Sequence, residues 1–167
     1  PKLLPAPDFV LWKICEYMTS TIEKAPYETV REGVINILLE ILDKIEQDKI
    51  IRFSQLLFKI FNYPCSTRLI NELIKKNISM SKEQTEEFFS VLSKATAANR
   101  TPEIQGYLLS LFPQVSAQTR REFIIAGLDV ESLQLIWSRF CDPNSQEFSV
   151  EISDSCFDLI IDNISGL

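Results

Sequence analysis

The amino-acid sequence predicts an all-α protein built from about nine short antiparallel helices. Apolar residues recur three and four positions apart along nearly the whole chain, as on one face of an α-helix, and seldom alternate as in a β-strand. Residue types that commonly start or end helices stand at nearly every joint between these apolar runs. With 167 residues, of which 46% are hydrophobic, the chain can bury a core without a metal or a disulfide. We therefore expect a single α-helical domain over residues 1–167.

The first two helices are predicted from a starting residue and from a face of apolar side chains. Asp8 is the expected N-cap of the first helix, which ends before Pro26. The second helix begins near residue 27 and has the cleanest helical pattern in the chain. Its expected buried face consists of Val30, Val34, Ile37, Leu38, Ile41, Leu42 and Ile45.

The third and fourth predicted helices flank a joint at Tyr63 and Pro64, where the proline disfavours helical backbone in the residue before it. The third runs from Asp48 to about Asn62 and is apolar on most sides, so we expect it to pack against more than one neighbour. The polar residues left on its surface form a stripe of Arg52, Gln55, Lys59 and Asn62. Ser66 is the expected cap of the fourth helix, which ends near Asn77.

The remaining five helices are predicted from their starting chemistry. The starts are Ser81 with Gln84 as a capping box, Thr101 before Pro102, Ser116, Asp129, and a position near residue 150 after a joint at residues 142–145. Pro113 closes the helix that starts at Thr101, and the helix from Ser116 reaches about Gly127.

The predicted helix pairs recur roughly every 30 to 40 residues, the range found in helical-repeat arrays. In helix length, joint length and all-helical composition the chain resembles HEAT and armadillo-like α-helical repeat proteins, although no repeat consensus is present. The resemblance implies an α-solenoid, in which each helix pair stacks on the next. A compact multi-helix bundle is the alternative, and the uneven spacing of the helix starts keeps it open.

Composition argues against catalysis. The sequence has no histidine and only four glycines, while most acid–base, metal and phosphate-binding chemistry relies on one or the other. It contains no glycine-rich phosphate loop, no nucleophile elbow and no zinc-binding pattern. We therefore predict no enzymatic activity, no cofactor and no metal site.

Cysteine usage and hydropathy bear on the compartment. The four cysteines are Cys15, Cys65, Cys141 and Cys156, with no C-x-x-C pair. Cys15 and Cys156 lie in strongly apolar helical runs, so we expect buried, reduced thiols and an intracellular protein, nuclear or cytoplasmic. No apolar stretch approaches the roughly 20 residues of a membrane span, which predicts no membrane partner. The chain begins with Pro1 and shows no signal segment, so we expect a piece of a larger chain.

Charge is unevenly distributed along the chain although the net charge is only -6. Residues 49–82 carry seven basic groups and one acidic group. We call the seven the basic band: Lys49, Arg52, Lys59, Arg68, Lys75, Lys76 and Lys82. Such a cluster favours binding of an acidic peptide or of nucleic-acid phosphates, or else it is a solvated face that binds nothing. The nearby Phe53, Phe58 and Phe61 have helical spacing, which predicts core packing rather than base stacking.

The C-terminal segment has the opposite character. Residues 140–167 contain six acidic residues and no basic one. Four of them share one face of the last predicted helix and form the acidic stripe: Glu151, Asp154, Asp158 and Asp162. This stripe is a second candidate contact surface, for a basic segment of a partner or for the basic band of a neighbouring copy. The alternative is a polar outer face that keeps a terminal helix solvated.

These observations lead to a hypothesis of function. We expect a non-enzymatic protein–protein interaction module, an adaptor or scaffold in a larger intracellular complex, with Arg52, Lys59, Lys75 and Lys76 as the main polar contacts. The alternative is a helical module that binds nucleic acid through the basic band. A third possibility is self-association through the opposite charge zones.

Overall fold

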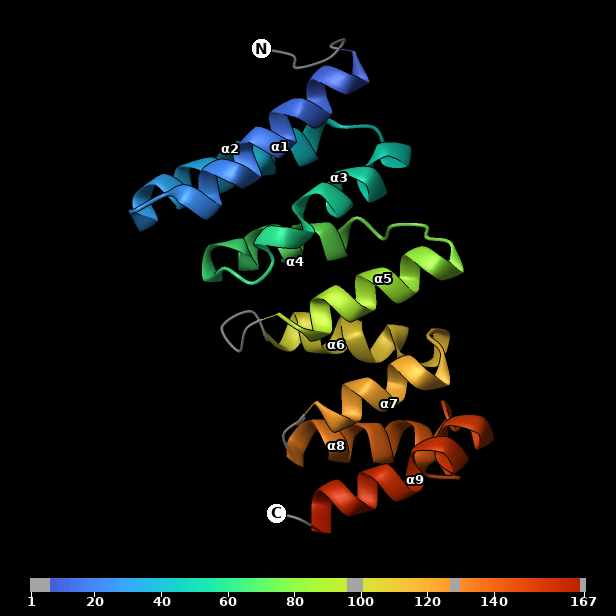
Figure 1. The fold of residues 1–167 in the computed structure, drawn as a ribbon. Helices are drawn as coiled ribbons and strands as arrows, with labels where there is room; N and C mark the ends of the chain where they lie inside the picture. Colours follow the sequence, from blue (N-terminus) through green and yellow to red (C-terminus); the bar gives the residue numbers. More distant parts are fainter. Residues whose placement is uncertain (1–6, 96–100, 127–129, 166–167) are drawn as a thin grey trace. The chain divides into compact units, whose positions relative to one another are not determined.

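A computed structural model describes residues 7–95, 101–126 and 130–165, and it confirms the all-α prediction (Figure 1). Nine α-helices, joined by short 3₁₀ turns and one π-helical segment, account for the regular structure of these residues, and no strand occurs among them. The chain forms two compact units. The first consists of the described residues of Pro1–Ser81 and Lys94–Tyr107, and the second of those of Lys82–Ser93 and Leu108–Leu167. The single domain remains a prediction.

The first unit is built from two helix pairs. Its elements are α1 (Asp8–Lys24), α2 (Glu28–Lys44), a 3₁₀ turn (Gln47–Lys49), α3 (Ile50–Leu57), 3₁₀ turns at Phe58–Ile60 and Pro64–Ser66, and α4 (Thr67–Lys75). The joint at Pro26 is short, so the chain reverses between α1 and α2 (Figure 1). Helix α1 packs on both α2 and α3, and α2 also packs on α4. Contacts in this unit therefore join neighbouring helices (α1 and α2) and also helices two apart in the sequence (α1 and α3, α2 and α4).

Packing on two sides rotates the buried face of α2 away from the predicted one. Val34, Leu38, Ile41 and Leu42 are buried as expected, and Ile35 is buried with them. Val30 and Ile37 are exposed, so their assignment to the core was wrong. The reason is that α2 lies between α1 and α4, so its buried surface includes Ile35, on a side that a single-face pattern leaves to solvent.

Two predicted caps of the first unit are also corrected. Pro7 holds the N-cap position of α1 and Asp8 is its first helical residue, with no side-chain hydrogen bond at the cap. Ser66 precedes α4 as expected, but its hydroxyl donates to the carbonyl of Ile60 at 2.6 Å instead of capping α4. The α1 cap fails because the helix begins one residue earlier than a cap at Asp8 allows, and the α4 cap fails because the Ser66 hydroxyl bonds to a residue six positions back. The buried Phe53 and Phe61 are core residues, as predicted, and the ring of Phe61 meets Phe58 edge-on at 5.5 Å.

The second unit is centred on aromatic side chains. It contains α5 (Lys82–Ser93), a 3₁₀ turn (Phe112–Gln114), α7 (Ala117–Ile125), α8 (Val130–Ile136), a π-helical segment (Trp137–Cys141) and α9 (Val150–Ser165), while α6 (Pro102–Leu111) spans the division between the units. Helix α7 packs on α5 and α9, and α8 also packs on α9. Phe89 and Phe123 lie 5.0 Å apart between ring centroids, and Phe112 stacks on Phe140 at 5.4 Å. These rings lie on four different elements and hold them together.

Two predicted N-caps in this half of the chain are present in the structure. The Thr101 hydroxyl accepts a hydrogen bond from the Ile104 amide at 3.3 Å, and Ser116 accepts one from the Thr119 amide at 3.2 Å. Both confirm the predicted N-caps. The predicted cap Asp129 lies outside the described residues. The π-helical segment after α8 was not predicted, because the apolar spacing of Leu133, Ile136 and Phe140 does not distinguish it from a continuing α-helix.

Candidate interaction groove

The structure brings three members of the basic band together. Arg68 and Lys75 lie on α4, Lys76 is the C-cap of that helix, and all three line a groove between α2 and α4. Arg52 and Lys59 lie on α3 and on the turn that follows it, and neither lines this groove. The basic band, continuous along the chain, is therefore divided in space.

Two of the basic residues outside the groove form ion pairs within the first unit. The Lys59 ammonium lies 3.6 Å from the Glu23 carboxylate. The Lys49 ammonium lies 3.0 Å from Asp8 and 3.4 Å from Glu46, and its hydrogen bond to Asp8 raises the Lys49 pKa. Arg52 is exposed and forms no ion pair with any residue in the described ranges. Much of the positive charge outside the groove is thus already matched by neighbouring acids.

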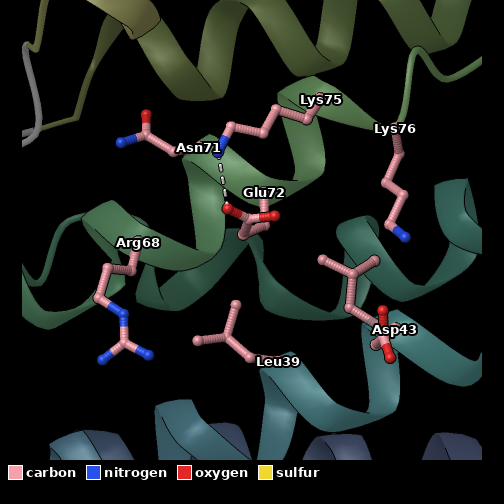
Figure 2. A pocket seen from close by; sticks show the side chains of 8 residues that line it. Leu39, Asp43, Arg68, Asn71, Glu72, Lys75 and Lys76 are labelled. Atoms are coloured by element: carbon pink, nitrogen blue, oxygen red, sulfur yellow. Dashed lines mark hydrogen bonds and ion pairs between the residues drawn. The ribbon is translucent and has the colours of Figure 1, made fainter.

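The groove itself, which we call the α2–α4 groove, is a hollow of about 460 Å³. Figure 2 shows Arg68 and Lys76 at its opposite ends, with Leu39 of α2 between them. The complete lining is Leu39, Leu42, Asp43, Arg68, Asn71, Glu72, Lys75 and Lys76. The groove therefore combines an apolar wall on α2 with charged side chains, most of them on α4.

Helical spacing explains why α4 offers charge to the groove. Its apolar residues Leu69, Ile70 and Leu73 are buried, which leaves positions 68, 72 and 75 on the outer face, three and four residues apart. The end of α4 is fixed from outside, because the Gln47 side-chain amide donates to the Lys76 carbonyl at 3.0 Å. Asn77, with φ of 51°, then ends the helix in the left-handed conformation that asparagine tolerates.

The relative direction of α2 and α4 decides which α2 residues form the second side of the groove. Arg68 donates to the Asn36 side-chain oxygen at 3.1 Å, and at the other end Gln47, just after α2, contacts Lys76. The two helices therefore run in the same direction, with Leu39, Leu42 and Asp43 of α2 facing the length of α4. Sequence reasoning missed these α2 residues, because helical periodicity does not say which helix packs beside which.

The charges in the groove are only partly neutralised. Lys75 pairs with Glu72 on its own helix at 2.9 Å, whereas Arg68 and Lys76 form no ion pair with a described residue. Asp43 adds a second acidic side chain, so the lining holds three basic and two acidic residues. The Asn71 side-chain oxygen is buried and accepts no hydrogen bond. In Figure 2 the Asn71 side chain points away from α2, so it is not offered to a ligand lying along Leu39.

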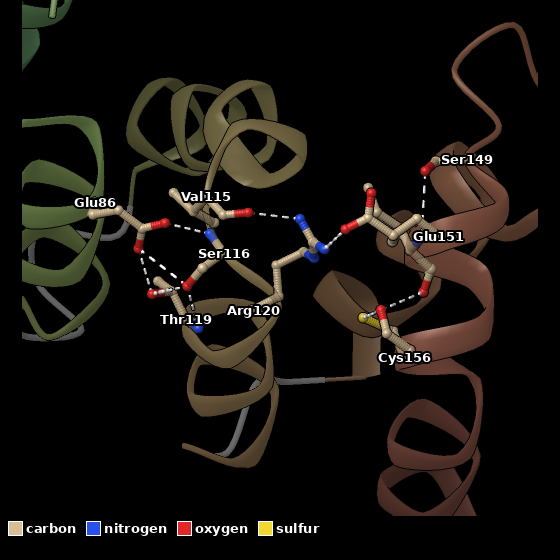
Figure 3. A network of polar contacts seen from close by, with 10 residues as sticks. Glu86, Val115, Ser116, Thr119, Arg120, Ser149, Glu151 and Cys156 are labelled. Atoms are coloured by element: carbon tan, nitrogen blue, oxygen red, sulfur yellow. Dashed lines mark hydrogen bonds and ion pairs between the residues drawn. The ribbon is translucent and has the colours of Figure 1, made fainter. Parts of the chain in front are cut away.

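The acidic stripe has one member that is already paired. Glu151 accepts a hydrogen bond from the buried Arg120 of α7 at 3.0 Å (Figure 3). Asp154 is exposed and forms no ion pair within the described part of the chain. The side chains of Asp158 and Asp162 lie outside the described residues. Sequence reasoning missed Arg120, since an arginine in an otherwise polar stretch of α7 gives no sign of burial.

The described residues offer neither a metal centre nor a membrane-spanning helix. No group of three or more metal-ligating side chains occurs among them, and none of their helices combines the length and apolarity of a membrane span. The four cysteines are buried with free thiols, as expected for Cys15 and Cys156. Burial raises the pKa of the Cys15 and Cys141 thiols to about 11, away from the range of a reactive thiolate.

Comparison with known proteins gives no relative. The sequence matches no family model and no curated protein, and the fold matches no solved structure.

Proposed function

We propose that this chain is a non-enzymatic protein-binding module, an adaptor or scaffold, whose α2–α4 groove binds an acidic segment of a partner. The observation that carries the proposal is that one hollow contains the half-buried Leu39, backed by the buried Leu42, together with the cations Arg68 and Lys76, which form no ion pair with a described residue. An apolar wall supplies burial and the flanking cations select carboxylates, a combination typical of grooves that bind amphipathic segments.

The composition of the groove favours a protein segment over nucleic acid. Asp43 and Glu72 stand among the cations, and a phosphate backbone would meet these carboxylates with like charge. Lys49 and Lys59, which would have to extend a phosphate-binding track, are held by Asp8 and Glu23. A protein segment can place a basic residue next to each of these acids, whereas a nucleic acid has no cationic group to place there.

The helix packing supports the helical-repeat hypothesis as part of the proposal. Contacts between α1 and α3, between α2 and α4, and in the second unit between α5 and α7, join helices that are two apart in the sequence. Stacked helix pairs make contacts of this kind, and the surfaces they create are used for binding extended partners.

The test is binding of a labelled amphipathic peptide in which Asp and Glu flank Leu and Phe, followed by fluorescence anisotropy. We expect Arg68→Glu with Lys76→Glu to weaken binding about tenfold or more, equal to at least about 1.4 kcal/mol. The matched control is Arg52→Glu with Lys59→Glu, which makes the same change of charge outside the groove and should bind nearly as the unchanged protein does.

Two further measurements complete the test. Circular dichroism shows whether each variant keeps its helical content. Duplex and single-stranded nucleic acids are titrated at about 50 mM and about 300 mM salt, where a phosphate-dependent complex would weaken strongly. Equal loss of peptide binding in both double variants, or tight salt-sensitive binding of nucleic acid, would overturn the proposal.

A further inference from the structure

We propose that the segment bound by the α2–α4 groove is helix α9 of a second copy of this chain. The proposal rests on the function proposed above and names its partner. Two surfaces of the same chain, the groove in the first unit and the outer face of α9 in the second, are complementary in charge and in apolar pattern.

Helix α9 presents apolar and acidic side chains together on one exposed face. Val150 is 61% exposed, Phe157 44% and Ile161 40%, and the exposed Asp154 lies between them in the sequence. The positions 150, 154, 157 and 161 are four, three and four residues apart, so they lie on one face of the helix. The opposite face is buried through Ile152 and Cys156. Helix α9 thus has a second apolar stripe that its own unit does not cover.

The charge of this helix matches the groove. The segment from residue 140 to 167 contains six acidic residues and no basic residue. Arg120 pairs with Glu151, but Asp154 is not paired with any described residue, and α9 also carries Asp158 and Asp162 in its sequence. In the groove, Arg68 and Lys76 are the cations without an acidic partner. Joining the two surfaces would pair charges that each surface leaves unmatched.

The apolar parts also correspond. The half-buried Leu39 is the apolar side chain that the groove offers between its cations, with the buried Leu42 behind it, and Phe157 is the largest exposed apolar side chain among the described residues of α9. The ring of Phe157 already packs on Trp137, with centroids 5.1 Å apart, so part of its conformational freedom is lost before binding. A side chain ordered in advance lowers the entropic cost of association.

The geometry of such an assembly follows from the use of two different surfaces. A pair joined by a single groove–α9 contact leaves one groove and one α9 free. Association therefore continues to a closed ring, of which a dimer with two reciprocal contacts is the smallest, or to an open chain. Because the contact depends on exposed charge, it weakens as salt increases.

The experiment measures molar mass by light scattering and by sedimentation, over a range of protein concentrations, at about 50 mM and about 300 mM salt. We expect the mass to rise with concentration and to fall when salt is added. The groove variant carries Arg68→Glu and Lys76→Glu. The α9 variant carries Val150→Ser, Asp154→Asn and Ile161→Ser, all at exposed positions, and leaves Phe157 in contact with Trp137.

Mixing the two variants is the decisive step. Each alone should remain monomeric, because it lacks one of the two surfaces. Together they should form a one-to-one dimer and nothing larger, since the intact groove of one binds the intact α9 of the other and no second contact is left. The Arg52→Glu, Lys59→Glu control should associate as the unchanged protein does. A peptide of residues 148–165 should compete with the self-association.

The outcomes separate this inference from the proposed function. If the unchanged protein keeps a monomer mass up to about 100 µM while its groove still binds the acidic probe peptide, the inference fails and the proposed function stands. Self-association that persists in the groove variant, with helical content unchanged, overturns the inference as well. If the groove binds neither the probe nor residues 148–165, both proposals fail.

Discussion

Arg120 of α7 is only 2% exposed, yet its charged partner Glu151 on α9 is 79% exposed. The guanidinium donates one hydrogen bond to the Val115 carbonyl at 2.7 Å and one to the Glu151 carboxylate at 3.0 Å, and its Nε has no acceptor. A buried cation is thus held by a carboxylate at the surface. This contact fixes α9 to α7, and therefore fixes the helix whose outer face we propose as a binding surface.

Removing Glu151 should destabilise the protein more than removing its neighbour Asp154. In Glu151→Ala the buried Arg120 loses its only acidic partner among the described residues and keeps its bond to Val115. We expect a loss of about 1–2 kcal/mol, limited because solvent screens the exposed carboxylate. Asp154→Ala removes an exposed acid from the same helix and should change stability by less than about 0.5 kcal/mol. Urea unfolding measures both, and equal losses would contradict the role assigned to Arg120.

Arg31 should stabilise the first unit as Arg120 stabilises the second. From α2 it donates to the carbonyls of Ile22 and Ala25 at 3.2 Å and 3.1 Å, which closes the end of α1, and it lies 5.1 Å above the Tyr63 ring. Lysine has one donor group and no planar fork, so Arg31→Lys should cost about 1–2 kcal/mol of folding free energy. Lys44→Ala, at an exposed position of α2, is the control. Equal unfolding midpoints for the two variants would count against this role.

The packing contact between α5 and α7 offers a third test. The Glu86 carboxylate accepts hydrogen bonds from the Ser116 amide and the Thr119 hydroxyl, so it sits at the N-terminus of α7 where an anion is favoured (Figure 3). Glu86→Gln should cost about 1 kcal/mol, because the amide lacks the charge and keeps only one acceptor. Glu83→Gln, at an exposed position of the same helix, should cost less. Thermal unfolding compares them, and an equal or larger loss for Glu83→Gln would refute the assignment.

How far the sequence predicts this fold depends on the range of the interaction. The caps at Thr101 and Ser116 were predicted because each bond closes over three residues. The cap at Ser66 failed because its hydroxyl bonds to Ile60, six residues back. Packing from two sides likewise moved the core face of α2. Helix class and position follow from local pattern, whereas the face that is buried depends on neighbours that the pattern does not identify.

The same limit applies to the groove. Arg68, Lys75 and Lys76 were predicted as contacts from their charge, and they do line one hollow. Its apolar wall comes from α2, about one helix pair away in the sequence, and only the packing of α2 on α4 brings Leu39 opposite them. The charge pattern of the sequence therefore identifies the charged side of the groove. Its apolar side can be identified only from the tertiary fold.

The buried thiols give the protein a predictable response to alkaline pH. Burial raises the pKa of Cys15 from 9.0 to about 11, and that of Cys141 to the same value. In the unfolded chain these thiols ionise near their ordinary pKa, whereas in the folded chain they stay protonated up to about pH 11. The unfolded state then binds fewer protons between these values, so the free energy of unfolding falls as pH rises from about 9 to about 11.

Comparison with Cys15→Ala isolates the thiol contribution. The variant is less stable at pH 8, because it leaves a small cavity in the core, but it should lose less stability than the unchanged protein between about pH 8 and about pH 10.5. Tyrosine and lysine titrate in both proteins, so their effects cancel in the comparison. The measurement is the urea midpoint at each pH. Parallel falls in the two proteins would mean that Cys15 ionises in the folded state as readily as in the unfolded one, contrary to its burial.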